Sequence, residues 1–168
     1  GSFLSWGGLL AIASGARYEQ GIVVASAEDE AHTLYHLALR ISLIFTLALL
    51  PIALAIGYVN PSLTPLGSSI YALPFFVLLS TWYNASALWE LRHKRYKILA
   101  KMQFIKGVGN NLLKAVFGFV AATIGSLISA QILSLIATFP LFFRSLKKGS
   151  KAPKTTSLGS VAKKYRGF

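Results

Sequence analysis

The uncharged stretch ISLIFTLALLPIALAI, residues 41–56, decides the fold class of this chain. A helix needs about 20 apolar residues to cross the hydrocarbon core of a membrane, so this stretch is slightly too short alone. Apolar residues before Arg40 complete it. We therefore expect a membrane-spanning helix over 34–56, with Arg40 inside its early turns.

Four further apolar runs have a suitable length, over residues 3–24, 70–89, 97–117 and 121–143. The chain is 54% hydrophobic and 13% charged, whereas a soluble domain carries about 25% charged residues. This composition excludes an ordinary soluble enzyme and a disordered chain. We predict an all-α fold, a polytopic transmembrane helical bundle of five spans in residues 1–143.

The charges are unevenly distributed, although the net charge is +12. All five acids precede residue 91, and residues 91–168 hold 15 basic residues. They stand mostly at the ends of apolar runs, which is typical of cytoplasmic loops and not of nucleic-acid binding. This pattern places loop 92–97 and the basic linker 144–168 in the cytoplasm, beside anionic lipid headgroups. The acidic segment 26–30 falls on the same side.

Four polar residues of the 97–117 run share one narrow stripe, because a helix turns by about 100° per residue. They are Gln103, Lys106, Asn110 and Lys114. Apolar side chains occupy the opposite side: Phe104, Ile105, Val108, Leu112, Ala115 and Val116. Ionisable residues inside a membrane face a bundle interior or a water-filled cavity, so the stripe predicts a cationic wall that binds an anionic, hydroxyl-rich solute. The alternative is that these groups satisfy polar partners on other helices.

Other candidate cavity residues lie in the first two spans. Arg17 and Glu19 are two positions apart, so they either line the cavity or mark the cytoplasmic end of the first span. His32, His36 and Arg40 recur every four residues on one face. They either continue the cavity wall or form the wet end of the second span.

The chain offers little material for catalysis. It has no cysteine, and its five acids lie mostly in one segment, so thiolate chemistry and acid–base catalysis are not favoured. Three histidines do not complete a tetrahedral metal site by themselves. We predict no enzyme activity, no cofactor and no metal site. Trp82, Tyr83 and Trp89 suit an aromatic belt at the cytoplasmic interface.

Several segments carry a resemblance. They are ARYEQGIV (16–23) with EDEA (28–31), WYN (82–84) with RHKRYKILA (92–100), IGSLI (124–128) with AQIL (130–133), and KKYRGF (163–168). In order and spacing they resemble motifs of bacterial oligosaccharide flippases, the polysaccharide biosynthesis proteins of O-antigen translocase type. These belong to the multidrug/oligosaccharidyl-lipid/polysaccharide exporter superfamily. Gly167 departs from the pattern, since the family usually has an acid there.

The resemblance implies that the chain is a piece of a longer protein, covering its second to sixth helices. The linker 144–168 would lead to the next helix, and the second helical bundle would be a partner within the same polypeptide. The implied activity moves undecaprenyl-diphosphate-linked oligosaccharide, the repeat unit of O-antigen, capsule or exopolysaccharide. Movement runs from the cytoplasmic to the periplasmic leaflet of the bacterial inner membrane, by alternating access around a cationic cavity.

The resemblance also gives the stripe a role, in which lysines attract the diphosphate and amides bond sugar hydroxyls. Three alternatives stay open. The first is a small-solute or drug exporter of the same superfamily, which an apolar cavity with an acid would favour. The second is a membrane-embedded polymerase of polysaccharide assembly. The third is a membrane scaffold whose basic tail binds lipid.

Overall fold

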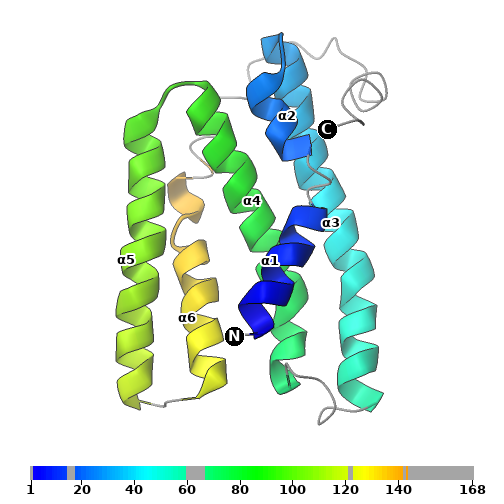
Figure 1. The fold of residues 1–168 in the computed structure, drawn as a ribbon, viewed down its shortest axis with the longest axis vertical. Coiled ribbons are helices and arrows are strands. Elements are labelled where there is room, and N and C mark those ends of the chain that lie inside the picture. Colours follow the sequence, from blue (N-terminus) through cyan, green and yellow to red (C-terminus); the bar gives the residue numbers. More distant parts are fainter. Residues whose placement is uncertain (1, 15–17, 60–66, 121–122, 142, 144–168) are drawn as a thin grey trace.

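The computed structural model describes residues 2–14, 18–59, 67–120, 123–141 and 143. Their regular structure is helical throughout, which confirms the all-α class (Figure 1). The elements are α1 (Ser2–Ser14), α2 (Tyr18–Val24), α3 (Glu28–Val59), the 3-10 helix η1 (Gly67–Ala72), α4 (Leu73–Arg92), α5 (Tyr96–Val120) and α6 (Ile124–Ile136).

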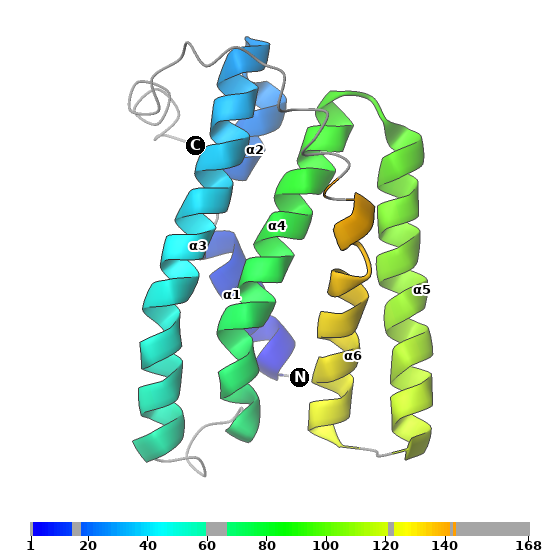
Figure 2. The same cartoon turned by 180° about the vertical axis from the view of Figure 1, so that it is seen from behind.

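Helix α4 is the centre of the bundle. Figures 1 and 2, which view the molecule from opposite sides, show α3 on one side of α4 and the α5–α6 hairpin on the other. Helix α6 lies between α4 and α5, while α1 and α2 pack against α3 and α4. Residues on all sides of α4 are buried, as expected for a helix enclosed by its neighbours.

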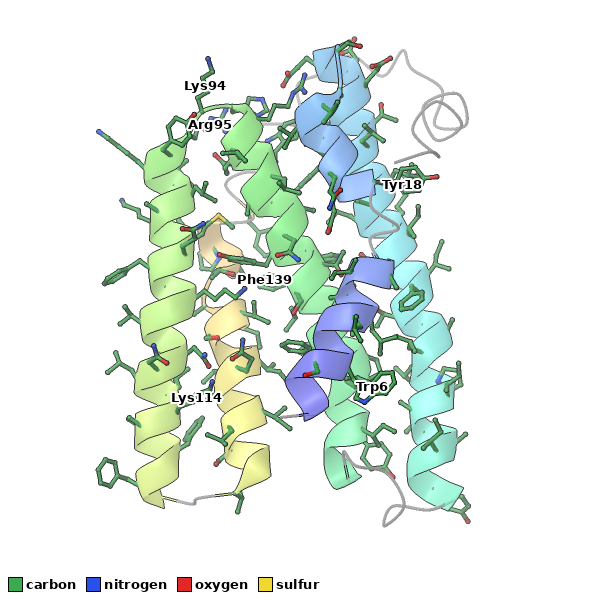
Figure 3. The ribbon with its side chains drawn as sticks, viewed as in Figure 1. Trp6, Tyr18, Lys94, Arg95, Lys114 and Phe139 are labelled. Atoms are coloured by element: carbon green, nitrogen blue, oxygen red, sulfur yellow. The ribbon has the colours of Figure 1, made fainter. Side chains whose placement is uncertain are left out.

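Two apolar clusters form the core, one on each side of α4. The first joins α2, α3 and α4 through Ile22, Ala25, Ala31, Leu34, Tyr35, Ala85 and Trp89. The second joins α4, α5 and α6 through Leu73, Phe76, Leu79, Tyr83, Met102, Ile128 and Leu135. Phe139 packs against both clusters (Figure 3). The expected aromatic belt is therefore wrong for Tyr83 and Trp89, because α4 directs both into the core.

The expected 3–24 run is divided into α1 and α2, which follow the same direction along the bundle (Figure 1). Arg17 lies between them, outside the described residues. Helix α1 packs closely against α4: a Cβ added at Gly7 would lie 2.6 Å from the Phe76 ring, so a larger residue there would force this ring to move. The Ser14 and Thr81 hydroxyls pair, and Thr81 Oγ1 also donates to the Ala11 carbonyl at 3.2 Å.

The remaining helices differ from their expected bounds at the ends. Helix α3 begins at Glu28 and not at residue 34, because acids occupy its first turn and Ser26 Oγ donates to Glu30 Oε2 at 3.1 Å. Helix α5 continues through Gly118 to Val120, beyond the expected end at residue 117. Helix α6 ends at Ile136 and not at residue 143. The Thr138 hydroxyl donates to the Leu135 carbonyl there at 2.6 Å. The basic linker 144–168 lies outside the described residues.

By length and composition, one described helix is able to cross a membrane. It runs from Glu28 to Tyr58, and its most apolar 18 residues have a mean hydropathy of 2.3, while the apolar helical stretches at 5–14 and 125–141 are shorter. Its 31 residues measure about 46 Å at 1.5 Å per residue, which exceeds the roughly 30 Å of a hydrocarbon core. Large apolar side chains are exposed along its later part: Leu43, Ile44, Leu47, Leu50, Ile52, Leu54 and Ile56.

Candidate functional site

The inner face of α5 carries three of the four stripe residues. Lys106, Asn110 and Lys114 are half-buried on the side that faces the rest of the bundle, and Lys114 extends from α5 toward α6 (Figure 3). The outer face is apolar and exposed at Phe104, Val108, Leu112 and Val116. Of the residues expected on that outer face, Ile105 is instead half-buried. Gln103 is exposed and stands apart from the other three.

Two members of this inner face have unusual surroundings. The Lys106 ammonium lies over the Tyr83 ring, 4.1 Å from its centroid, a cation–π contact with α4. The Asn110 Oδ1 atom is fully enclosed and has no hydrogen-bond partner among the described residues. An enclosed acceptor without a donor is destabilising. We call Lys106, Asn110 and Lys114 the α5 stripe.

The other candidate residues lie across α4 from the α5 stripe. Glu19 is buried on α2, and its Oε2 atom has no hydrogen-bond partner in the part of the chain that the structure describes. Arg40 is exposed on α3, one turn beyond the half-buried His36. Because α4 stands between α3 and α5, Glu19 and Arg40 form a group separate from the α5 stripe (Figures 1 and 2).

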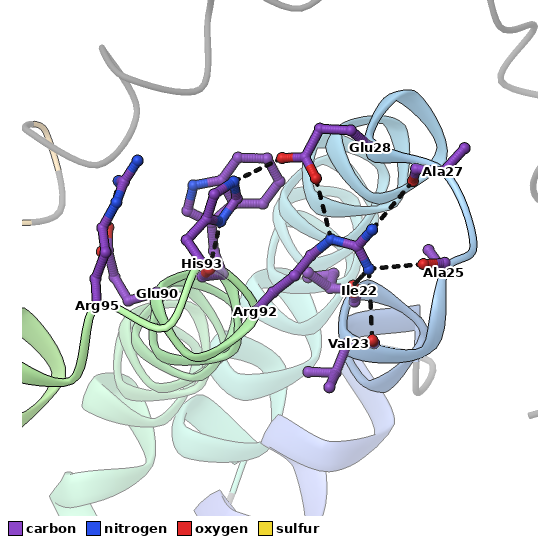
Figure 4. Close-up of polar contacts among 10 residues, drawn as sticks. Ile22, Val23, Ala25, Ala27, Glu28, Glu90, Arg92, His93 and Arg95 are labelled. Carbon is purple, nitrogen blue, oxygen red and sulfur yellow. Dashed lines mark hydrogen bonds and ion pairs between the residues drawn. The ribbon is translucent and has the colours of Figure 1, made fainter.

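A dense polar junction closes the end of the bundle where α2, α3 and α4 meet (Figure 4). Arg92 Nη1 donates to the carbonyls of Ile22 at 2.8 Å and Ala25 at 2.7 Å, and Arg92 Nε bonds Glu28 Oε2 at 3.3 Å. Contacts with the Val23 and Ala27 carbonyls, at 3.4 and 3.3 Å, complete the set. The last carbonyls of α2 have no partner within the helix, and a cation there also suits the helix dipole.

His93 and Glu28 extend this junction. His93 Nδ1 donates to the Trp89 carbonyl at 2.8 Å, and its Nε2 lies 2.6 Å from Glu28 Oε1. Partial burial acts to raise the pKa of Glu28, but the hydrogen bonds and charges of His93 and Arg92 outweigh it and lower the pKa below its ordinary value. The acidic segment 26–30 and the basic loop 92–97 therefore lie at the same end of the bundle. This was predicted, because two successive spans separate them and return the chain to the same side.

The turn from α4 to α5 is a Schellman motif. The Lys94 N–H bonds the Leu91 carbonyl and the Arg95 N–H bonds the Glu90 carbonyl, both at 3.0 Å. Lys94 has a φ of 54°, a left-handed conformation that glycine usually supplies. Beneath the turn, the Glu90 side chain is 0% exposed, with Arg95 Nη1 3.6 Å from its Oε1.

Sequence reasoning missed the junction and the Tyr83 contact. The sequence places Arg92, His93 and Glu28 in charged segments between apolar runs, but no spacing rule connects residues 64 or 65 positions apart. No group of three or more metal-ligating side chains gathers among the described residues. No protein-family model, no curated protein and no solved structure matches this chain.

Proposed function

We propose that this chain is the N-terminal part of a membrane transporter that moves undecaprenyl-diphosphate-linked oligosaccharide from the cytoplasmic to the periplasmic leaflet. In this proposal the five apolar runs cross the bacterial inner membrane, with the 26–30 and 92–97 segments in the cytoplasm. A second helical bundle of the same polypeptide completes the cavity. The proposal includes no bond cleavage, so it requires neither a catalytic residue nor a cofactor.

The observation that carries the proposal is the two-sided character of α5. Its inner face presents Lys106, Asn110 and Lys114, and its outer face presents exposed apolar side chains. Cations, and an amide oxygen that has no partner among the residues that the structure describes, suit a ligand with phosphate and hydroxyl groups. The exposed apolar faces of α3 and α5 suit lipid, because soluble monomers rarely expose continuous apolar surface. The resemblance in the sequence supplies the substrate class.

The decisive experiment measures transbilayer movement of a diphosphate-linked oligosaccharide in vesicles that contain the full-length protein. The rate of movement should fall at least tenfold in the Lys106→Ala/Lys114→Ala variant. The reason is that the variant removes two cations, each of which would form a charge-assisted hydrogen bond with the diphosphate. The matched control is Lys97→Ala/Lys101→Ala, which removes two exposed lysines from the same helix. Equal rates in both variants would discard the stripe as the site, and no movement in wild type would reject the function.

Thiol labelling tests the membrane placement separately, because the chain has no native cysteine. Asn110→Cys should react with a membrane-impermeant charged maleimide that enters the cavity. Leu112→Cys should not react, because a lipid-facing thiol is out of reach of such a reagent. If the molecule were soluble, the more exposed Leu112 position would react faster, and that result would contradict the membrane placement.

A small-solute exporter is the second candidate, and Glu19 favours it. This carboxylate is 7% exposed, and its Oε2 atom lacks a donor among the described residues. A buried acid on a helix suits recognition of a cationic solute. Under this candidate, Glu19→Gln abolishes efflux of a cationic dye while Asp29→Asn does not. Under the flippase proposal, both variants leave dye levels unchanged.

A further inference from the structure

We infer that His32 and His36 form a binding site for a divalent transition-metal ion at the start of α3. The two residues are one helical turn apart, and their Nε2 atoms converge to 3.3 Å. The site is separate from the α5 stripe and independent of the transport proposal, because both ligands belong to the opposite side of α4 (Figures 1 and 2).

The separation of the two nitrogens suits a shared metal ion. At a metal–nitrogen distance of about 2.05 Å, nitrogens 3.3 Å apart subtend about 107° at the ion, close to the tetrahedral angle. Imidazole nitrogen is a preferred ligand of copper, nickel and zinc. The ion would bind both converging nitrogen atoms in place of the hydrogen bond that joins them here.

The rings are held in position by buried neighbours. His32 packs edge-on against Trp89, with ring centroids 5.9 Å apart, and His36 packs against Tyr35 at 5.6 Å. Trp89 and Tyr35 belong to the first apolar cluster, and the Tyr35 hydroxyl is bonded to Ser86 Oγ at 3.3 Å. Two ligands supported in this way need little reorganisation when an ion binds.

The site remains open to solvent and to further ligands. His32 and His36 are both half-buried, so an ion can reach the nitrogens. Since no third metal-ligating side chain joins them among the described residues, water fills the remaining coordination positions, as in sites with an open position. Arg40, one turn beyond His36, opposes a cation and limits the affinity.

Titration of Cu²⁺ and Zn²⁺ into the purified full chain, free of any polyhistidine tag, tests the site. We expect one ion per chain, with Cu²⁺ tighter than Zn²⁺ and no binding of Mg²⁺. His32→Gln and His36→Gln should each weaken binding by roughly tenfold or more, because each removes one of two protein ligands. His93→Gln is the matched control, since both ring nitrogens of His93 already contact Glu28 and the Trp89 carbonyl. The affinity of this variant for the metal ion should differ from that of wild type by less than about twofold.

A spectroscopic signature separates the site from other sources of metal binding. Copper bound at this site should show electron paramagnetic resonance coupling to two nitrogens, reduced to one in either single variant. Helicity measured by circular dichroism confirms that each variant is folded. Absence of binding in wild type overturns the inference. So does binding that persists unchanged in the folded His32→Gln/His36→Gln double variant.

Discussion

The two sides of α4 use polar residues in opposite ways. On the α2–α3 side, Arg92 satisfies the last carbonyls of α2 and the Glu28 carboxylate. On the α5–α6 side, Lys106 rests on an aromatic ring and Asn110 Oδ1 is enclosed without a hydrogen-bond partner among the described residues. The first arrangement stabilises the fold. The second leaves an enclosed acceptor unsatisfied in the described part of the chain, which destabilises the fold.

Removal of Arg92 should produce the largest effect. Arg92→Ala should lower the free energy of unfolding by about 3 kcal/mol, because it strips several carbonyls and one carboxylate of a charged donor. Arg92→Lys keeps the charge but loses the guanidinium fork, so an intermediate loss is expected. Denaturant unfolding in detergent micelles, followed by circular dichroism, measures both. If Arg92→Ala were as stable as wild type, the Arg92 contacts would not stabilise the fold, and the two sides of α4 would not differ in this respect.

The opposite sign is expected on the other side of α4. Asn110→Leu should raise the free energy of unfolding by about 1 kcal/mol, because it replaces an enclosed acceptor that has no donor in the described part of the chain. The control is Ala115→Leu, on the outer face of the same helix, which should stay within about 0.5 kcal/mol of wild type. A loss of stability in Asn110→Leu would mean that the amide is structural. Under the flippase proposal, the stabilised variant also loses transport.

The α4–α5 turn sharpens the comparison, because it joins the two sides. Lys94→Gly should raise the free energy of unfolding by about 1 kcal/mol, since glycine adopts a positive φ without strain. Lys101→Gly makes the same change at an exposed position inside α5 and should lower it by about 1 kcal/mol. Thermal unfolding of the pair checks the signs. Equal shifts in the same direction would show that the left-handed residue is not strained.

The smallest effect is the acid response of Glu28. Its pKa is lower in the folded chain than in the unfolded chain, so its contribution is complete above the unfolded value of about 4.3. That contribution is lost as the pH falls through the folded value. Between pH 6 and pH 3, wild type should lose a few tenths of a kcal/mol more than Glu28→Gln, a small difference because the carboxylate is half exposed. Identical pH profiles would contradict the ion pair.

Helical periodicity predicted the orientation of α5 well, since Lys106 and Asn110 face inward and Leu112 faces outward. It did not place Gln103, because the position of the neighbouring helices centres the buried face on Met102 and Gly109 instead. Periodicity gives a direction relative to the helix itself and says nothing about what stands opposite. For the same reason, no pattern in the sequence indicates that Tyr83 lies under Lys106.

The junction at Arg92 was beyond sequence reasoning for a different reason. Its acceptors are backbone carbonyls at the end of α2, among them that of Ile22, 70 positions before Arg92. Every residue has a backbone carbonyl, so no residue type in the sequence marks these acceptors. The division of 3–24 into α1 and α2 was also missed, because the apolar composition continues through both helices. Composition therefore identified the class of fold, and only packing identified which charges are structural.

The polar contacts of α1 and α2 have a consequence for the order of assembly. Ser14 pairs with Thr81, which is 67 positions later in the chain, whereas α5 and α6 are adjacent in sequence and pack directly together. Contacts close in sequence form faster than distant ones. During synthesis, the first two helices must wait for α4 to emerge before their hydroxyl and carbonyl groups find partners, while the last hairpin closes as soon as it is made. Helices α1 and α2 therefore lack these partners until α3 and α4 have been made, whereas α6 meets its partner in the helix that directly precedes it.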